Sequence, residues 1–282
     1  MSKTWLITGT STGFGKELAL YIAKKSDTNL VATARNLKQL EYLNNYNHGQ
    51  ILKLQLDVTK PEQIKNVVQQ TINKFSTIDV LDNNAGLGYF STFEEAYERE
   101  VRYMFEVNFW GLVHMTQAVL PIMRKQKTGT IISISSIYGL LGNPSVSFYS
   151  ATKFAVEGAM ESLSQEIKND NIKVMLIEPS GFRTDWAGRS SRKKVSKFKD
   201  YEKTNERISR MNNYSGHQAG DPKIAAKIVY NQVANHHEDL PSKLPLGHQS
   251  LNFSKQKFAD LVTNFKKLKP LSYSADSPRE KE

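Results

Sequence analysis

Short apolar runs alternate with longer, more polar segments along most of this chain. The short runs are rich in β-branched residues, which favours strands. They lie at 4–8, 29–33, 51–56, 78–81, 129–134 and 172–177, and a seventh is predicted within 240–246. In the longer segments apolar residues recur at helical spacing, as at Leu18 and Ile22. The alternation predicts an α/β fold: a doubly wound, Rossmann-type sheet of about seven parallel strands in a three-layer αβα sandwich.

The length and composition fit one domain, predicted over residues 1–268 of the 282. The tail over 269–282 is rich in Ser, Pro and charge and is expected to be disordered. No apolar run approaches the ~18 residues of a membrane helix, and the first residues lack a signal-peptide pattern, so we expect a cytoplasmic protein without a membrane partner. The absence of Cys excludes thiolate zinc sites and a Cys nucleophile, and the His spacing predicts no metal site.

A glycine-rich turn follows the first predicted strand. Gly9, Gly13 and Gly15 lie between that strand and a predicted helix from Lys16. Such a turn lets backbone amides approach a pyrophosphate, which then lies at a helix N-terminus where unpaired N–H groups favour an anion. A tight turn without a ligand is the alternative, but the strand before and the helix after favour dinucleotide binding.

The end of the second strand favours NADP over NAD. In dinucleotide-binding folds an acidic residue about 20 positions past the turn binds the ribose 2′-hydroxyl. Here Ala34 and Arg35 occupy that place. A guanidinium suits the 2′-phosphate of NADP, although an exposed Arg can also be only a solvated charge.

Tyr149 and Lys153 are four residues apart in a segment of helical period. On a helix they project from one face, and an ammonium beside a phenol lowers a pKa that is ordinarily near ~10. This predicts a proton donor and acceptor. Ser136 ends the preceding strand, at the sheet edge where open α/β sheets bind ligands.

Together these motifs resemble the classical type of the short-chain dehydrogenase/reductase family, over roughly residues 4–185. The resemblance rests on ordered motifs: Thr-Gly-(x)3-Gly-x-Gly at 8–15, Asp57-Val58, Asn83-Asn84-Ala85-Gly86, Asn108, Ser136, and Tyr149 with Lys153. It implies an oxidoreductase that uses NADP(H), with NAD(H) less favoured, to reduce a ketone or aldehyde or to oxidise the corresponding alcohol. The alternative is a sensor with this fold that binds NAD(P) without turnover; such proteins characteristically lose the Tyr or the Lys.

The resemblance also implies roles for individual residues. Tyr149 would be the general acid, Ser136 would orient the carbonyl, and Lys153 would bind the nicotinamide ribose and lower the pKa of Tyr149. Asn108 would hold a water molecule in a proton relay, and Ser136 and Tyr149 would bind the substrate. The implied cofactor-binding residues are Gly9, Ser11, Thr12, Gly13, Phe14, Gly15, Arg35, Asp57, Val58, Asn84, Ala85, Gly86, Tyr149, Lys153, Pro179, Gly181 and Thr184.

Two positions depart from the family pattern. Asp82 stands where an apolar residue is usual, so its charge needs a donor or solvent. After the sixth strand the family has Pro-Gly, whereas here Ser180 separates Pro179 from Gly181.

Most of the net charge of +10 lies in one segment. Residues 183–210 hold ten basic and four acidic side chains, a net charge of +6. Resembling enzymes carry a substrate lid here, predicted over about 183–220. We favour charges that face water; the alternatives are attraction of an acidic substrate and protection of the NADP phosphates. Nucleic acid is not predicted as a partner, because this segment offers only Trp186, Phe198 and Tyr201 as aromatics and has no groove-binding motif. The family also implies a homodimer or homotetramer through the helices around 98–125 and 147–169.

Overall fold

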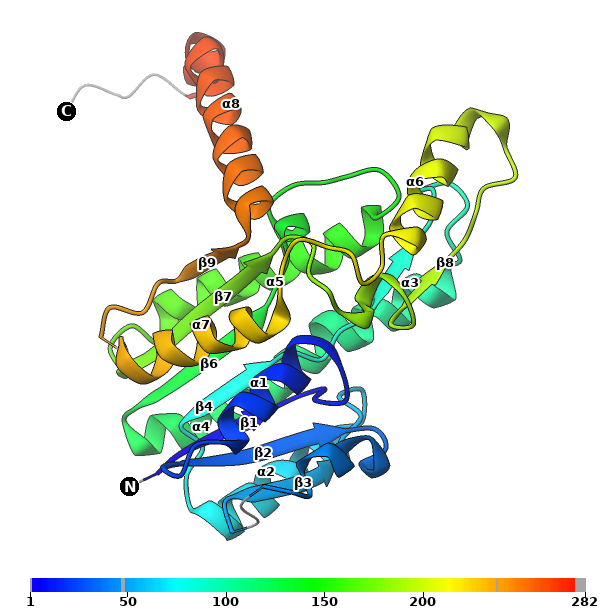
Figure 1. Cartoon of the computed structure of the whole chain (residues 1–282). Helices are drawn as coiled ribbons and strands as arrows, with labels where there is room; N and C mark the ends of the chain where they lie inside the picture. The colour runs from blue at the N-terminus through cyan, green and yellow to red at the C-terminus, as the bar shows by residue number, and fades with distance from the viewer. Residues whose placement is uncertain (1, 47–48, 237, 277–282) are drawn as a thin grey trace, which may run out of the picture.

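The computed structural model describes residues 2–46, 49–236 and 238–276, and its centre is one parallel sheet (Figure 1). The strand order is β3-β2-β1-β4-β6-β7-β9, and all neighbouring pairs are parallel. The strands are β1 (Lys3–Ile7), β2 (Thr28–Ala34), β3 (Ile51–Gln55), β4 (Val80–Asn83), β6 (Gly129–Ile134), β7 (Ile172–Pro179) and β9 (Lys243–Leu246). The predicted doubly wound sheet is confirmed.

Helices cover both faces of this sheet, so the three-layer prediction is also confirmed. One apolar core lies under α1 (Gly13–Ala23) and α7 (Pro222–Asn235). The core on the other face lies under α2 (Pro61–Phe75), α4 (Gly111–Gln126) and α5 (Ser147–Glu166). Strands buried on both faces explain why the sequence shows continuous apolar runs.

A smaller unit lies beyond the carboxyl ends of the strands. It contains α3 (Glu98–Phe105), α6 (Glu202–Asn213) and a two-stranded parallel sheet of β5 (Gly88–Phe90) and β8 (Ser191–Lys193). The sequence did not predict these strands, because three residues are too few to show a period. The predicted lid is therefore an ordered segment that pairs with β5 and packs α6 over the end of the sheet (Figure 1).

Helix α8 (His248–Tyr273) projects from the sheet edge beside β9 (Figure 1). It extends into the region predicted as a disordered tail, so residues 269–273 are helical, and residues 277–282 lie outside the described part of the chain. The stretch 255–269 contains neither Gly nor Pro, and the helix continues past Pro270 to Tyr273. Within the described residues, none of the helices has the length and apolarity that crossing a membrane requires.

Asp82 is buried in the central strand β4, where only 1% of it is exposed. Ile7 and Ile132 flank it in register on the neighbouring strands. Its Oδ1 atom has no hydrogen-bond partner among the described residues, and burial raises its pKa to about 8. The carboxyl therefore finds neither the donor nor the solvent that the sequence suggested, and it is mainly protonated at neutral pH.

We expect Asp82 to make the stability of the protein depend on pH. A carboxyl whose pKa is raised in the folded state stabilises the fold in acid, and this contribution is lost as the pH rises toward about 8. Between about pH 6 and pH 8 the wild type should lose on the order of 2 kcal/mol of unfolding free energy relative to Asp82→Asn, measured by urea denaturation. Asp200→Asn, at an exposed position, is the control. Parallel pH profiles of the wild type and Asp82→Asn would contradict this account.

Candidate active site

A cavity of about 860 Å³ lies at the carboxyl ends of the central strands. Among the predicted site residues, all except Gly15 and Asn108 line it. Those that do are Gly9, Ser11, Thr12, Gly13, Phe14, Arg35, Asp57, Val58, Asn84, Ala85, Gly86, Ser136, Tyr149, Lys153, Pro179, Gly181 and Thr184. Residues from six loops of the sequence are thus brought to one place.

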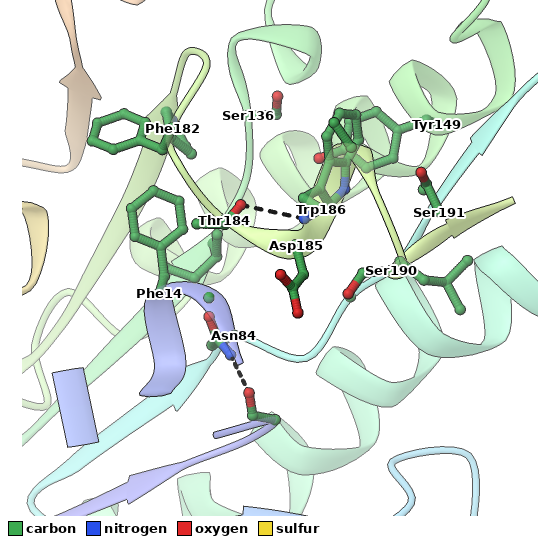
Figure 2. Close-up of a pocket in the computed structure, with 18 of the residues that line it drawn as sticks. Phe14, Asn84, Ser136, Tyr149, Phe182, Thr184, Asp185, Trp186, Ser190 and Ser191 are labelled. Carbon is green, nitrogen blue, oxygen red and sulfur yellow. Dashed lines mark hydrogen bonds between the residues drawn. The ribbon is translucent and has the colours of Figure 1, made fainter. Parts of the chain in front are cut away.

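The glycine turn is held by the side chain of Asn84. Its Nδ2 atom donates to the carbonyl oxygens of Thr8 (2.8 Å) and Gly9 (3.0 Å), and Figure 2 shows Asn84 beside the turn. Gly9 and Gly13 adopt φ angles of 71° and 62°, which favour glycine. Glycine is required at position 15 for a different reason. A Cβ atom there would collide with the Asn84 amide and lie 2.8 Å from the Gly9 carbonyl oxygen.

The N-terminus of α1 is suited to an anion. Thr12 occupies the N-cap position, and among the described residues its side chain makes no capping hydrogen bond; the first turn also contains no acidic residue. Backbone N–H groups therefore remain free at the cavity, as a pyrophosphate would require. The turn and helix fit the dinucleotide that the motif predicted.

The far end of the cavity is formed by residues after β2 and β3. Arg35 is exposed there, and its side chain has no ion-pair partner among the described residues. The Asp57 carboxylate accepts from the backbone N–H (3.0 Å) and the hydroxyl (2.7 Å) of Thr59, so it is held by its own turn. The Arg35 guanidinium is thus an unpaired cation among the described residues at this end.

Helix α5 places Tyr149 and Lys153 on the cavity wall, one turn apart. The Lys153 ammonium lies 5.7 Å from the centre of the Tyr149 ring and donates to the Ile134 carbonyl oxygen (2.7 Å). Ser136 begins a short 3-10 helix and its hydroxyl accepts from the Tyr138 N–H (3.1 Å). Three of the four predicted catalytic side chains, all except Asn108, therefore line one cavity.

Burial dominates the pKa values of this pair. It raises the pKa of the Tyr149 phenol above the ordinary range, and the nearby Ser136 hydroxyl opposes this rise. It lowers the pKa of Lys153 to about 8, against the opposing charge of Glu157. The pKa of Tyr149 is raised, whereas its Lys neighbour was expected to lower it. Tyr149 is only 6% exposed, and the cost of burying a phenolate is larger than the effect of the neighbouring charge.

Asn108 lies behind the cavity, in the π-helical turn over Glu106–Trp110. Its side chain pairs with both backbone groups of Leu87, accepting from the N–H (2.8 Å) and donating to the carbonyl oxygen (2.9 Å). It also donates to the Thr152 hydroxyl (3.2 Å). Asn108 therefore connects β5 to α5, and its predicted part in a proton relay stays a prediction.

Trp186 is a site residue that the sequence analysis missed. Its ring packs against Tyr149 with centroids 4.8 Å apart, and its backbone N–H donates to the Thr184 hydroxyl (3.4 Å) (Figure 2). The only available indication was its position soon after β7, in the predicted lid. Trp186 covers the phenol and is one reason for its burial.

The shifted glycine at 181 does not distort the loop after β7. A Cβ atom at Gly181 would meet only Gln218, at ordinary contact distances of 3.4 Å or more. Ser180 donates its N–H to the Leu246 carbonyl oxygen (3.0 Å), and the Phe182 ring packs on Phe14 (4.9 Å). Ser180, at the usual place of the glycine, therefore contacts β9, and Phe182 contacts the residue after Gly13 in the glycine turn.

Known proteins share this sequence pattern and architecture. The family model for short chain dehydrogenases matches residues 3–195. The relative named oxidoreductase BOA17, from Botryotinia fuckeliana, is 33% identical over 277 residues, covering 98% of this chain and 100% of that protein. A crystal structure of a short-chain dehydrogenase from Streptomyces avermitilis superposes with a TM-score of 0.88 at 30% identity, covering 98% and 99% of the two chains. ElxO with NADP bound has a TM-score of 0.73 at 28% identity, covering 89% and 99%.

We expect Gly15→Ala to damage the turn. The new methyl group displaces the Asn84 amide from the two carbonyl oxygens, which should cost about 1–3 kcal/mol of unfolding free energy and weaken nicotinamide dinucleotide binding roughly tenfold or more. Urea denaturation and fluorescence titration with NADPH measure the two effects.

The matched control is Gly158→Ala. Gly158 lies in α5 and a Cβ atom there would meet nothing within 4 Å, so this variant should be neutral or slightly more stable. Equal losses in both variants would contradict the role given to Gly15.

Proposed function

This chain belongs to the short-chain dehydrogenase family, and on that premise we propose that it is an NADP(H)-dependent oxidoreductase. It reduces the carbonyl group of a ketone or aldehyde, or oxidises the corresponding alcohol. The observation that carries the proposal is the meeting of Ser136, Tyr149 and Lys153 in the cavity that also contains the glycine turn.

The bound nicotinamide supplies or accepts the hydride at the carbonyl carbon. In the direction of reduction, Tyr149 donates its phenolic proton to the carbonyl oxygen, so that the alcohol leaves neutral. Its raised pKa keeps the phenol protonated in the closed cavity, as a proton donor must be. Ser136, beside the phenol, donates a hydrogen bond that orients the same oxygen.

Lys153 has two tasks in this proposal. Its ammonium binds the nicotinamide ribose, and its positive charge stabilises the phenolate that forms when the proton leaves. Glu157, one turn further along α5, supports the charged form because it raises the pKa of Lys153 against burial. Asn108 holds the neighbouring loop and a water molecule through which Tyr149 regains its proton.

The choice of NADP over NAD rests on Arg35. Ala34 stands where an acidic side chain would repel the 2′-phosphate of NADP. The Arg35 guanidinium at the cavity wall provides a positive charge that can bind this phosphate. The NADP bound to ElxO supports this choice, because that protein shares the fold at 28% identity.

We further propose a homodimer or homotetramer built on the helices around α4 and α5. Trp110 and Phe154 support it, since these large apolar side chains are exposed on that side, at 44% and 43%. The cytoplasmic location stays a prediction from the sequence.

The Tyr149→Phe variant distinguishes the two hypotheses, an oxidoreductase and a sensor that binds NAD(P) without turnover. Loss of the proton donor should lower the rate of NADPH oxidation with an accepted ketone or aldehyde by about a thousandfold, while NADPH binding persists. Tyr103→Phe removes a hydroxyl from the same cavity and should keep most of the activity. Turnover that survives in Tyr149→Phe would overturn the mechanism, and a wild type that binds NADPH but consumes no carbonyl compound would favour the sensor.

Arg35→Ala tests the cofactor preference. The KM for NADPH should rise roughly tenfold or more, because a charge-assisted contact to phosphate is lost, while the KM for NADH should change little. Lys38→Ala is the control, since Lys38 is an exposed cation nearby that does not line the cavity. A wild type that prefers NADH would refute the role of Arg35.

A further inference from the structure

The lid arginines differ in what neutralises them. Arg183 pairs with Asp221 (3.0 Å), Arg189 with Asp185 (2.9 Å) and Arg210 with Glu206 (3.3 Å). Arg192 pairs with Glu100. Most of the guanidinium groups in this basic segment therefore have a carboxylate of their own and are not available to a ligand.

Arg207 is the exception among the lid arginines that line the cavity. It projects from α6 and is half-buried, and no carboxylate lies within 4.0 Å of it in the described part of the chain. Its hydrogen bond is to the phenolic oxygen of Tyr138, at 3.3 Å. A phenol accepts a hydrogen bond but does not neutralise a cation, so this half-buried charge has no counter-ion among the described residues.

Tyr138 connects this charge to the reaction centre. Its ring stands nearly perpendicular to that of Tyr149, with centroids 6.4 Å apart, and its backbone N–H donates to the Ser136 hydroxyl. Arg207 therefore lies one side chain away from the two residues that would hold the carbonyl group. A substrate bound between them would present its carbonyl to Tyr149 and a second group to Arg207.

We infer that Arg207 is the binding site for a carboxylate of the substrate. The inference rests on the proposed function and names its substrate class: carbonyl compounds that also carry a carboxylate. A guanidinium binds a carboxylate through two parallel hydrogen bonds, which fixes the orientation of the substrate as well as attracting it. The same cavity wall also contains the apolar or aromatic side chains of Tyr138, Trp186 and Met211, which would strengthen this ion pair by excluding water.

The inference changes the interpretation of the basic segment. The sequence favoured charges that face water, whereas four of the five arginines pair with carboxylates. At Arg207 the second hypothesis, attraction of an acidic substrate, fits better. The preference for a substrate with a carboxylate therefore depends on one residue of α6 and not on the net charge of the lid.

The experiment compares keto acids with their methyl esters, which have the same carbonyl group without the charge. Pyruvate, acetoacetate and levulinate place the carboxylate at increasing distance from the carbonyl carbon. For at least one pair, the wild type should show a kcat/KM with NADPH that is roughly tenfold or more higher for the acid. Arg207→Gln should raise KM for that acid by a similar factor and leave the ester within about twofold, and Arg207→Lys should keep part of the preference.

Arg210→Gln is the matched control, because it removes the same charge from the same helix at an ion-paired position that does not line the cavity. It should leave both substrates unchanged. Equal kcat/KM values for acid and ester in the wild type, or equal losses for both in Arg207→Gln, would overturn the carboxylate site.

A binding measurement keeps this inference distinct from the proposed function. Calorimetric titration of the three keto acids into the chain with NADP+ should show binding by the wild type that Arg207→Gln loses. Turnover of esters without any binding or preference for the acids defeats the Arg207 inference alone. Binding that depends on Arg207 without turnover of any compound defeats the proposed activity and retains the anion site.

Discussion

The hydrogen bonds between Asn84 and the glycine turn join the two central strands at the place where the cavity begins. The Asn84 amide holds the carbonyl oxygens of Thr8 and Gly9, and the Thr8 hydroxyl accepts from the backbone N–H groups of Asn84 and Ala85 (3.0 Å each). These contacts turn the backbone carbonyls of the loop inward, so its N–H groups and the start of α1 remain directed at the cavity. The close approach requires a residue without a side chain at Gly15.

A row of side chains with alternating charge lies between α5 and the strands β7 and β9. Lys153 is followed one turn later by Glu157, which is 5% exposed and pairs with Lys243 of β9 (2.7 Å). Glu178 lies nearby, and burial raises its pKa to about 7. Glu157 raises the pKa of Glu178 further, whereas Lys243 opposes that rise and pairs with Glu157, so Lys243 of β9 is the group that offsets the burial of these carboxyls beside α5.

The sequence predicted the parts of the site that depend on local rules. Buried parallel strands show as apolar runs, the turn requires glycines, and Tyr149 and Lys153 are related by one helical turn. Two contacts could not be predicted, because they join segments far apart in the chain: the pairing of Asn108 with Leu87 and the packing of Trp186 on Tyr149. The apolar cluster that contains Phe90, Tyr149 and Ile208 could not be predicted for the same reason. The pKa of Tyr149 was mispredicted for the same reason: a neighbouring cation is visible in the sequence, whereas burial by a distant lid is not.

The segment predicted as a lid is held mainly by apolar packing. Part of this packing is against Tyr149, so the segment influences the pKa of the phenol. Its ion pairs are largely exposed and contribute only about 0–1 kcal/mol each, whereas Ile208 is buried in the cluster that contains Tyr149. Trp186 adds the contact that covers the phenol. Burial is the largest influence on the phenol, so the packing of this segment over Tyr149 contributes to its raised pKa. The packing of the segment therefore favours the protonated form of the phenol.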